Sequence, residues 1–236
     1  MNEFMLIVLA FVSAVLSASI GAGGGILLLS LLPGFIPTAA IVPVHGMVQL
    51  ASNASRVAFD LKQVEWRILT QYCLGAALGA AVGSRFVVKF PTDYLPVLLG
   101  CFILLMAWMP DFKVRFRLPG DLFSLGAFQS FIALFVGSPG PLSLSVLFRK
   151  GLSRDQMVVT NSMLMISLHL LKVLTFGLLG FVFRPYWVLI AGMSVGVTLG
   201  SYVGTRLRSK VPEKLFRKLL GIVLTLLAVR MIIRAF

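Results

Sequence analysis

The side chains best suited to binding or chemistry lie within long apolar stretches of the chain. Along residues 37–59 they are spaced four, three and four positions apart, and at 100° per residue they fall within about 60° of one another on a helix. This first set is His45, Gln49, Ser52 and Arg56. Residues 154–181 carry a second set, Asn161, His169 and Lys172. Because polar groups are costly inside a membrane span, we expect both sets to face the interior of a helix bundle.

Two clusters rich in glycine and proline interrupt otherwise apolar stretches. The first is Gly21-Ala22-Gly23-Gly24-Gly25, and the second is Gly137-Ser138-Pro139-Gly140-Pro141. Relative to alanine, glycine costs about 1 kcal/mol and proline about 3 kcal/mol within a helix, so both clusters should unwind it. Unwound backbone at membrane depth is tolerated only where it is buried in protein or lines a wet cavity.

A helix that restarts after such a break presents free N–H groups and the positive end of its dipole, and both attract anions. The sequence therefore predicts an anion site in which the two breaks lie beside the two polar sets. Its candidate backbone residues are Gly21, Gly23, Gly24, Gly25, Gly137, Ser138 and Gly140. Its candidate side chains are His45, Gln49, Arg56, Asn161, His169 and Lys172.

The acidic residues support an anion, because none lies in the middle of an apolar stretch. Carriers of cations usually need an intramembrane carboxylate. Any coupling ion is expected to be a proton on His45 or His169. The sequence has no Ser/His/Asp set and no phosphate-binding loop, and two histidines are too few for a metal site. We therefore expect neither an enzyme nor a bound cofactor or metal.

These side chains also have structural interpretations, which stay open at this stage. Arg56 and Lys172 could extend their charged ends to the membrane interface. His45 and His169 could be packing residues whose polar atoms are satisfied by neighbouring helices. The glycine clusters are the stronger functional signal, because they occur twice and each carries a cost in stability.

The composition excludes an ordinary soluble domain. Of 236 residues, 58% are hydrophobic and 12% are charged, and the mean hydropathy is +0.98. Apolar stretches near the length of a membrane crossing cover residues 4–32, 37–59, 66–88, 94–110, 119–148, 154–181, 186–205 and 215–233. Most of the 21 Lys and Arg residues lie between these stretches, as in cytoplasmic loops, so no nucleic-acid partner is expected. We predict an all-α polytopic protein with one membrane domain, residues 1–236, surrounded by the lipid bilayer.

The chain contains an internal duplication. Residues 75–100 and 196–221 share eleven identities at a shift of 121, among them glycines spaced four apart, which are expected to be helix-packing surfaces. A weaker match at a shift of 116 aligns the two glycine clusters and sets Arg56 opposite Lys172. We predict two repeats, residues 1–115 and 116–236, each with an interrupted helix followed by three transmembrane helices.

The distribution of cations favours inverted repeats. If both interrupted stretches enter and leave the membrane on the same side, fourteen Lys and Arg residues collect on one side and five on the other. The positive-inside rule prefers this arrangement over full crossings, which leave almost no bias. The segments before and after each break are unequal in length, so a broken helix that crosses the membrane stays open as the alternative.

The first break has a recognisable context: Ile20-Gly21-Ala22-Gly23-Gly24-Gly25-Ile26-Leu27-Leu28, then Leu32-Pro33-Gly34, then a helix near Pro37-Thr38-Ala39-Ala40. With a second break one repeat later, the whole chain resembles the sulfite exporter TauE/SafE family. The resemblance implies transport of small sulfur-containing anions, such as sulfite and organosulfonates, across the bacterial inner membrane. It also implies that Gly21, Gly23, Gly24 and Gly25 form the first turn around the anion. The second cluster departs from the pattern, because Pro139 and Pro141 remove two N–H donors.

The function expected from these features is a secondary transporter, in the exporting direction, for a small oxyanion such as sulfite or an organosulfonate. Alternating access would come from one repeat rocking against the other. An anion channel and a non-transporting membrane scaffold are the alternatives, and a homo-oligomer stays open.

Overall fold

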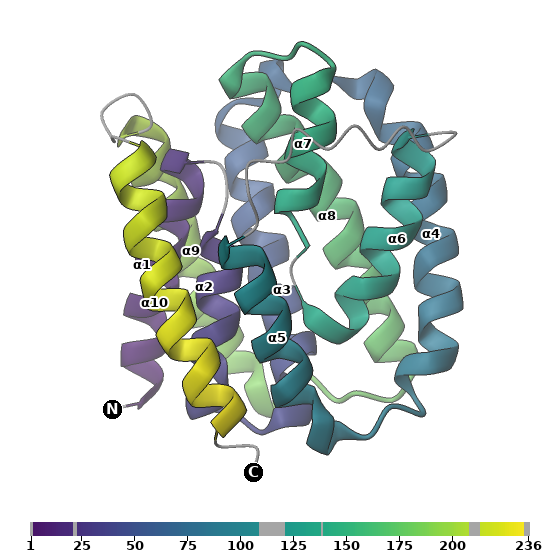
Figure 1. Cartoon of the computed structure of the whole chain (residues 1–236), viewed down its shortest axis with the longest axis vertical. Coiled ribbons are helices and arrows are strands. Elements are labelled where there is room, and N and C mark those ends of the chain that lie inside the picture. The colour runs from purple at the N-terminus through teal and green to yellow at the C-terminus, as the bar shows by residue number, and fades with distance from the viewer. Residues whose placement is uncertain (1, 21–22, 109–120, 138, 208–212, 234–236) are drawn as a thin grey trace.

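The computed structural model describes residues 2–20, 23–108, 121–137, 139–207 and 213–233, and its described part is all-helical (Figure 1). The helices of the first half are α1 (Asn2–Ile20), α2 (Gly24–Leu31), α3 (Thr38–Phe59), α4 (Trp66–Val87) and α5 (Leu95–Trp108). Those of the second half are α6 (Asp121–Val136), α7 (Pro141–Arg149), α8 (Arg154–Leu178), α9 (Trp187–Leu207) and α10 (Glu213–Ile233). Short 3₁₀ turns, η1 (Leu32–Gly34), η2 (Leu61–Gln63), η3 (Thr92–Tyr94) and η4 (Arg184–Tyr186), connect several of them.

The helices coincide with the eight apolar stretches, and the two predicted interruptions are present. α1 ends at Ile20 and α2 begins at Gly24, whereas α6 ends at Val136 and α7 begins at Pro141. The glycine and proline clusters therefore break the helices, as their helix propensities predict.

By length and hydropathy, two helices among the described residues could cross a membrane alone, Arg154–Leu178 and Arg184–Leu207. A third candidate is the pair Trp66–Val87 and Thr92–Trp108, which bends by 115°. α3 is long enough but carries the polar set, and α1, α2, α6 and the end of α10 are shorter apolar helices. This pattern suits a helical membrane protein in which polar and broken helices are enclosed by apolar ones.

Glycines hold two pairs of helices in close parallel contact. A Cβ atom at Gly75 or Gly79 of α4 would meet the backbone of Phe123 or Ala127 of α6. In the same way, Gly196, Gly200 and Gly204 of α9 lie against the backbone of Ile7, Phe11 and Val15 of α1. In both pairs the residue numbers rise together, so the helices are parallel. The packing role expected of these glycines is confirmed.

The remaining contacts fix the direction of the central helices. α3 is parallel to α9, since Val44 packs with Ile190 and Phe59 with Tyr202. α4 is parallel to α8, since the backbone N–H just before α4 bonds Thr160 and Cys73 bonds Ser167. α3 and α8 are antiparallel, because Gly46 lies beside Lys172 whereas Val57 packs with Val159.

Because α1 and α3 are both parallel to α9, they run in the same direction. Because α6 and α8 are both parallel to α4, they also share one direction, which is opposite to that of α3. The chain must therefore turn back between α1 and α3 and again between α6 and α8. These directions place Lys62, Arg67, Arg149, Lys150, Arg154 and Arg206 at one end of the bundle. They place Arg85, Lys89, Arg184 and Arg230 at the other end.

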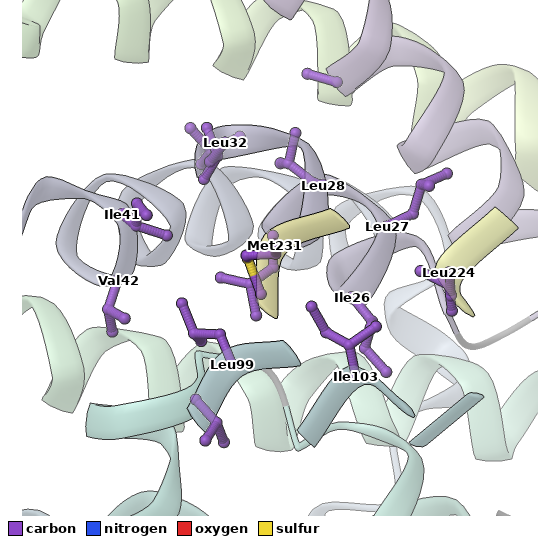
Figure 2. Packing of buried hydrophobic residues seen from close by; sticks show 14 of the residues in the cluster. Ile26, Leu27, Leu28, Leu32, Ile41, Val42, Leu99, Ile103, Leu224 and Met231 are labelled. Carbon is purple, nitrogen blue, oxygen red and sulfur yellow. The ribbon is translucent and has the colours of Figure 1, made fainter. Parts of the chain in front are cut away.

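The largest buried apolar cluster surrounds α2 and the start of α3 (Figure 2). Leu28 and Leu32 are fully buried there, and Ile103 of α5 and Met231 of α10 close the cluster from the other side. α2 is only eight residues long, so its position depends on this packing rather than on its own helical stability.

Candidate functional site

The centre of the site is a group of three buried basic side chains where α3 crosses α8. His45 of α3 and His169 of α8 are 0% and 1% exposed, and their ring centroids are 6.0 Å apart at an interplanar angle of 76°. Lys172, one turn along α8 from His169, is 1% exposed. Each of the two polar sets predicted from the sequence thus contributes side chains to this buried group. The burial of Lys172 excludes an extension of its ammonium group to the membrane interface.

The first break lies beside this group. Gly23 has φ +90°, a conformation that side-chain-bearing residues rarely adopt, and the helix restarts there without a side-chain cap. Gly24 is packed so closely on α1 that a Cβ atom would collide with the backbone oxygen of Ser13. The backbone oxygen of Gly25 lies 2.9 Å from Nε2 of His45. Gly21 falls outside the described residues.

The second break meets the same histidine from the opposite side. Gly137 has φ +82°, and a Cβ atom built on it would lie 3.5 Å from Nδ1 of His45 and 2.8 Å from the Leu29 side chain. Nζ of Lys172 donates a hydrogen bond of 2.8 Å to the Gly137 oxygen. His45 therefore lies between the two breaks, with Nε2 on the backbone oxygen of Gly25 and Nδ1 facing Gly137. Ser138 falls outside the described residues.

At the start of α7, neither Pro141 nor Leu142 has a free backbone N–H. Pro141 has none, and the N–H of Leu142 bonds the Pro139 oxygen at 3.1 Å. Gly140 has no unusual dihedral angle, and a Cβ atom there would only touch Met165 at 3.6 Å. The second cluster departs from a glycine-rich turn in its structure as well as in its sequence. Its helix restarts at a proline and with a bonded N–H, whereas the first helix restarts at glycines.

Arg56 is buried, at 4% exposure, and is held by α1 and its own helix. It donates to Ser17 Oγ at 2.9 Å, to Asn53 Oδ1 at 2.7 Å and to the Ser52 oxygen at 3.3 Å. Gln49 is also buried, and its backbone oxygen accepts a hydrogen bond of 2.7 Å from Asn53. This burial excludes interface snorkelling for Arg56 as well.

Asn161 belongs to a neutral network around the second break. The Ser143 hydroxyl lies within hydrogen-bond distance of the Asn161 amide oxygen and, at 2.8 Å, of the Gly140 oxygen, and its single proton can bond either one. Gln129 of α6 donates to the Pro139 oxygen at 2.7 Å and accepts from the Tyr72 hydroxyl at 2.9 Å. All four side chains are buried. The structure thus places Asn161 away from the basic group.

Tyr72, Gln129 and Ser143 were not among the residues expected from the sequence. Gln129 could have been noticed, because it is the one amide inside the apolar stretch that precedes the second break. Tyr72 and Ser143 carry no comparable signal, since a tyrosine and a serine in apolar helices are ordinary packing residues.

The charge of the basic group is not balanced by protein carboxylates among the residues described. Arg149 forms an ion pair with Asp121 at the cation-rich end, whereas Lys172 pairs with no described Asp or Glu. Both histidine Nδ1 atoms are buried without a hydrogen-bond partner. The described part of the chain contains no group of three or more His, Cys, Asp and Glu side chains that could hold a metal ion. A buried positive charge with open hydrogen-bonding atoms suits a small anion.

Fold and site together define a polytopic helical membrane protein with two broken helices around a buried basic centre. The family model of the sulfite exporter TauE/SafE matches residues 6–231, nearly the whole chain. The protein belongs to this family and is a membrane transporter of the sulfite-exporter type. The comparisons with curated proteins and with solved structures give no match.

Proposed function

We propose that the protein is a secondary transporter that exports sulfite or an organosulfonate across the bacterial inner membrane. The observation that carries the proposal is the position of Lys172 and His45 between the two breaks. One ammonium group and two imidazoles lie there without a described carboxylate partner. Arg56, Gln49 and the N-terminal turn of α2 at Gly23, Gly24 and Gly25 extend the site on the side of the first repeat. Gly137 and Gly140 bound it on the side of the second, whereas Asn161 belongs to the neutral network beside Gly140.

Alternating access is proposed between two inverted repeats, residues 1–115 and 116–236. Two observations support it. Each helix of the first half runs opposite to its counterpart in the second, as the pairs α1 with α6 and α3 with α8 illustrate. The central side chains are buried, so an anion reaches them only when the protein opens, and movement of one half against the other would provide such an opening.

The orientation follows from the two groups of cations. The positive-inside rule assigns the cation-rich end to the cytoplasm. A negative cytoplasm then drives anions outward, at about 2.3 kcal/mol per charge per 100 mV. Exit of an anion is therefore the direction that the membrane potential favours without a second ion.

The test is counterflow in proteoliposomes loaded with sulfite. Saturable exchange of labelled for unlabelled sulfite, lost in Lys172→Leu and His45→Leu, is expected. Single-channel currents without counterflow would instead favour an anion channel. A protein that moves no anion and tolerates leucine at His45, Arg56 and Lys172 would be a scaffold, and the proposal would be wrong.

A further inference from the structure

His45 presents one hydrogen-bonding atom to the centre of the site, and its chemical nature can be derived. Nε2 lies 2.9 Å from the Gly25 oxygen. A carbonyl oxygen only accepts hydrogen bonds, so the proton of a neutral His45 lies on Nε2. Nδ1 then carries a lone pair. This atom faces Gly137 and is buried without a partner. Nδ1 of the neighbouring His169 is also buried without a hydrogen-bond partner.

A buried acceptor without a donor is costly, by roughly the free energy of desolvating the atom. An anion that is only an acceptor does not relieve this cost, because two lone pairs then face each other. An anion that also carries a donor does.

The charge of the site sets a second condition. Lys172 is the cation whose ammonium group reaches the Gly137 backbone beside Nδ1, and it has no described carboxylate partner. One positive charge is neutralised by one negative charge, so a monoanion leaves less uncompensated charge in the site than a dianion.

No other described titratable group faces His45 closely enough to change this balance. On the elements packed against α3, the others are Arg56 of α3 itself, Asp93 and Tyr94 on η3, Arg184 and Tyr186 on η4, Asp121 on α6, Arg154 and Asp155 on α8, and Tyr202 and Arg206 on α9. The Arg56 guanidinium donates to Ser17, Asn53 and Ser52 rather than toward His45. Asp93, Tyr94 and Arg184 are exposed at the end where α3 begins, and Tyr186 packs with Val44. Asp121, Arg154, Asp155, Tyr202 and Arg206 belong to the opposite end of the bundle.

From these contacts we propose that the site takes a sulfur oxyanion as a monoanion that donates a hydrogen bond to Nδ1 of His45. The species of this kind are hydrogensulfite and organosulfonates that bear a hydroxyl or ammonium group. Sulfate, and sulfonates with purely apolar tails, do not qualify. The inference rests on the proposed function and refines it by naming the class of substrate.

Two ligands of nearly equal size test the donor directly: 2-hydroxyethanesulfonate and 1-propanesulfonate, in which a methyl group replaces the hydroxyl. Binding to the purified full-length protein is measured by calorimetry, and transport by counterflow against sulfite. We expect the hydroxyl compound to bind at least about tenfold more tightly, which is the worth of one buried hydrogen bond. Equal affinities would overturn the inference.

Two variants link the preference to His45. In His45→Gln the amide nitrogen can still donate to the Gly25 oxygen, but the Nδ1 acceptor is lost, so the preference for the hydroxyl compound should disappear. Ser162→Ala is the matched control, because Ser162 is buried on α8 and bonds only the Val158 oxygen of its own helix. It should retain the preference. A tenfold preference that persists in His45→Gln would place the acceptor elsewhere and refute the assignment.

A third comparison separates hydrogensulfite from the sulfonates. Sulfite binding is measured from pH 6 to pH 8, where hydrogensulfite gives way to the dianion, with 2-hydroxyethanesulfonate as the reference. We expect sulfite affinity to fall relative to the reference as the pH rises, and a constant ratio would contradict the inference. If neither ligand class is bound or transported, the proposed function itself fails. Sulfite transport without a donor preference refutes only the present inference.

Discussion

Replacement of Lys172 by methionine separates a functional charge from a structural one, because the two roles predict opposite changes in stability. The methionine side chain has nearly the same length and is apolar at its end. The stem of Lys172 packs closely on Gly46, where a Cβ atom would lie 2.8 Å from the lysine Cε. Methionine keeps this packing while the ammonium group is removed.

The expected effect on stability can be estimated. Burial of an unpaired ion costs several kcal/mol after relaxation of the protein. Loss of the hydrogen bond to the Gly137 oxygen costs about 1–3 kcal/mol, because a buried carbonyl is left without its donor. The net change for the ligand-free protein is a gain of about 1–2 kcal/mol. For a chain of this size each kcal/mol raises Tm by about 2–4 °C.

The effect on anion binding has the opposite sign. Loss of a buried charge that pairs with the ligand costs about 3–5 kcal/mol, which is at least a hundredfold in affinity. Thermal unfolding without anion and calorimetric titration with sulfite measure the two effects. Lys89→Met is the control, since Lys89 is exposed at the end of the bundle and should change neither quantity. A lower Tm combined with unchanged sulfite affinity would show that Lys172 is structural.

Two further predictions concern the packing and the network around the site. Gly79→Ala should lower the free energy of unfolding by about 1–3 kcal/mol, because the new methyl group meets the Ala127 backbone of α6. Gly34→Ala, where a Cβ atom meets nothing within 4 Å, should change it far less, and equal effects in thermal unfolding would argue against the α4–α6 contact. Tyr72→Phe removes the donor to Gln129 and should cost about 1–3 kcal/mol in the same assay. An unchanged Tm would mean that the network does not stabilise the second break.

The fold was largely predictable because its determinants are local in sequence. Glycine and proline in an apolar stretch end a helix wherever they occur, so the breaks after Ile20 and Val136 could be placed from composition alone. The spacing of polar residues along α3 also predicted that His45, Gln49, Ser52 and Arg56 would share one buried face, and all four are buried. Periodicity is a property of a single helix and needs no tertiary information.

The details of the site could not be predicted, because they depend on contacts between helices. No sequence pattern indicates that Nε2 of His45 meets the Gly25 oxygen, or that Lys172 reaches the Gly137 oxygen. The same limit applies to Asn161. It corresponds to His45 in the repeat alignment, yet it bonds Ser143 in a neutral network rather than joining the basic group. Repeat symmetry predicts a position in the fold and not the chemistry of the side chain there.

In the proposed site the two breaks would contribute unequally to holding an anion. At the first, glycine backbone is packed tightly on α1, with Arg56 bonded to Ser17 of that helix and His45 to Gly25. At the second, prolines have removed backbone donors. The side chains of Gln129 and Ser143 lie there instead, bonded to the backbone oxygens of Pro139 and Gly140. Among the described residues, the positive group that bonds the second break is the ammonium of Lys172. Because that group is the main contribution of charge from the second half of the chain, changes in α8 should alter the affinity for the anion. Changes in Gln129, Ser143 or Tyr72 should alter the stability of the break and leave the choice of anion intact.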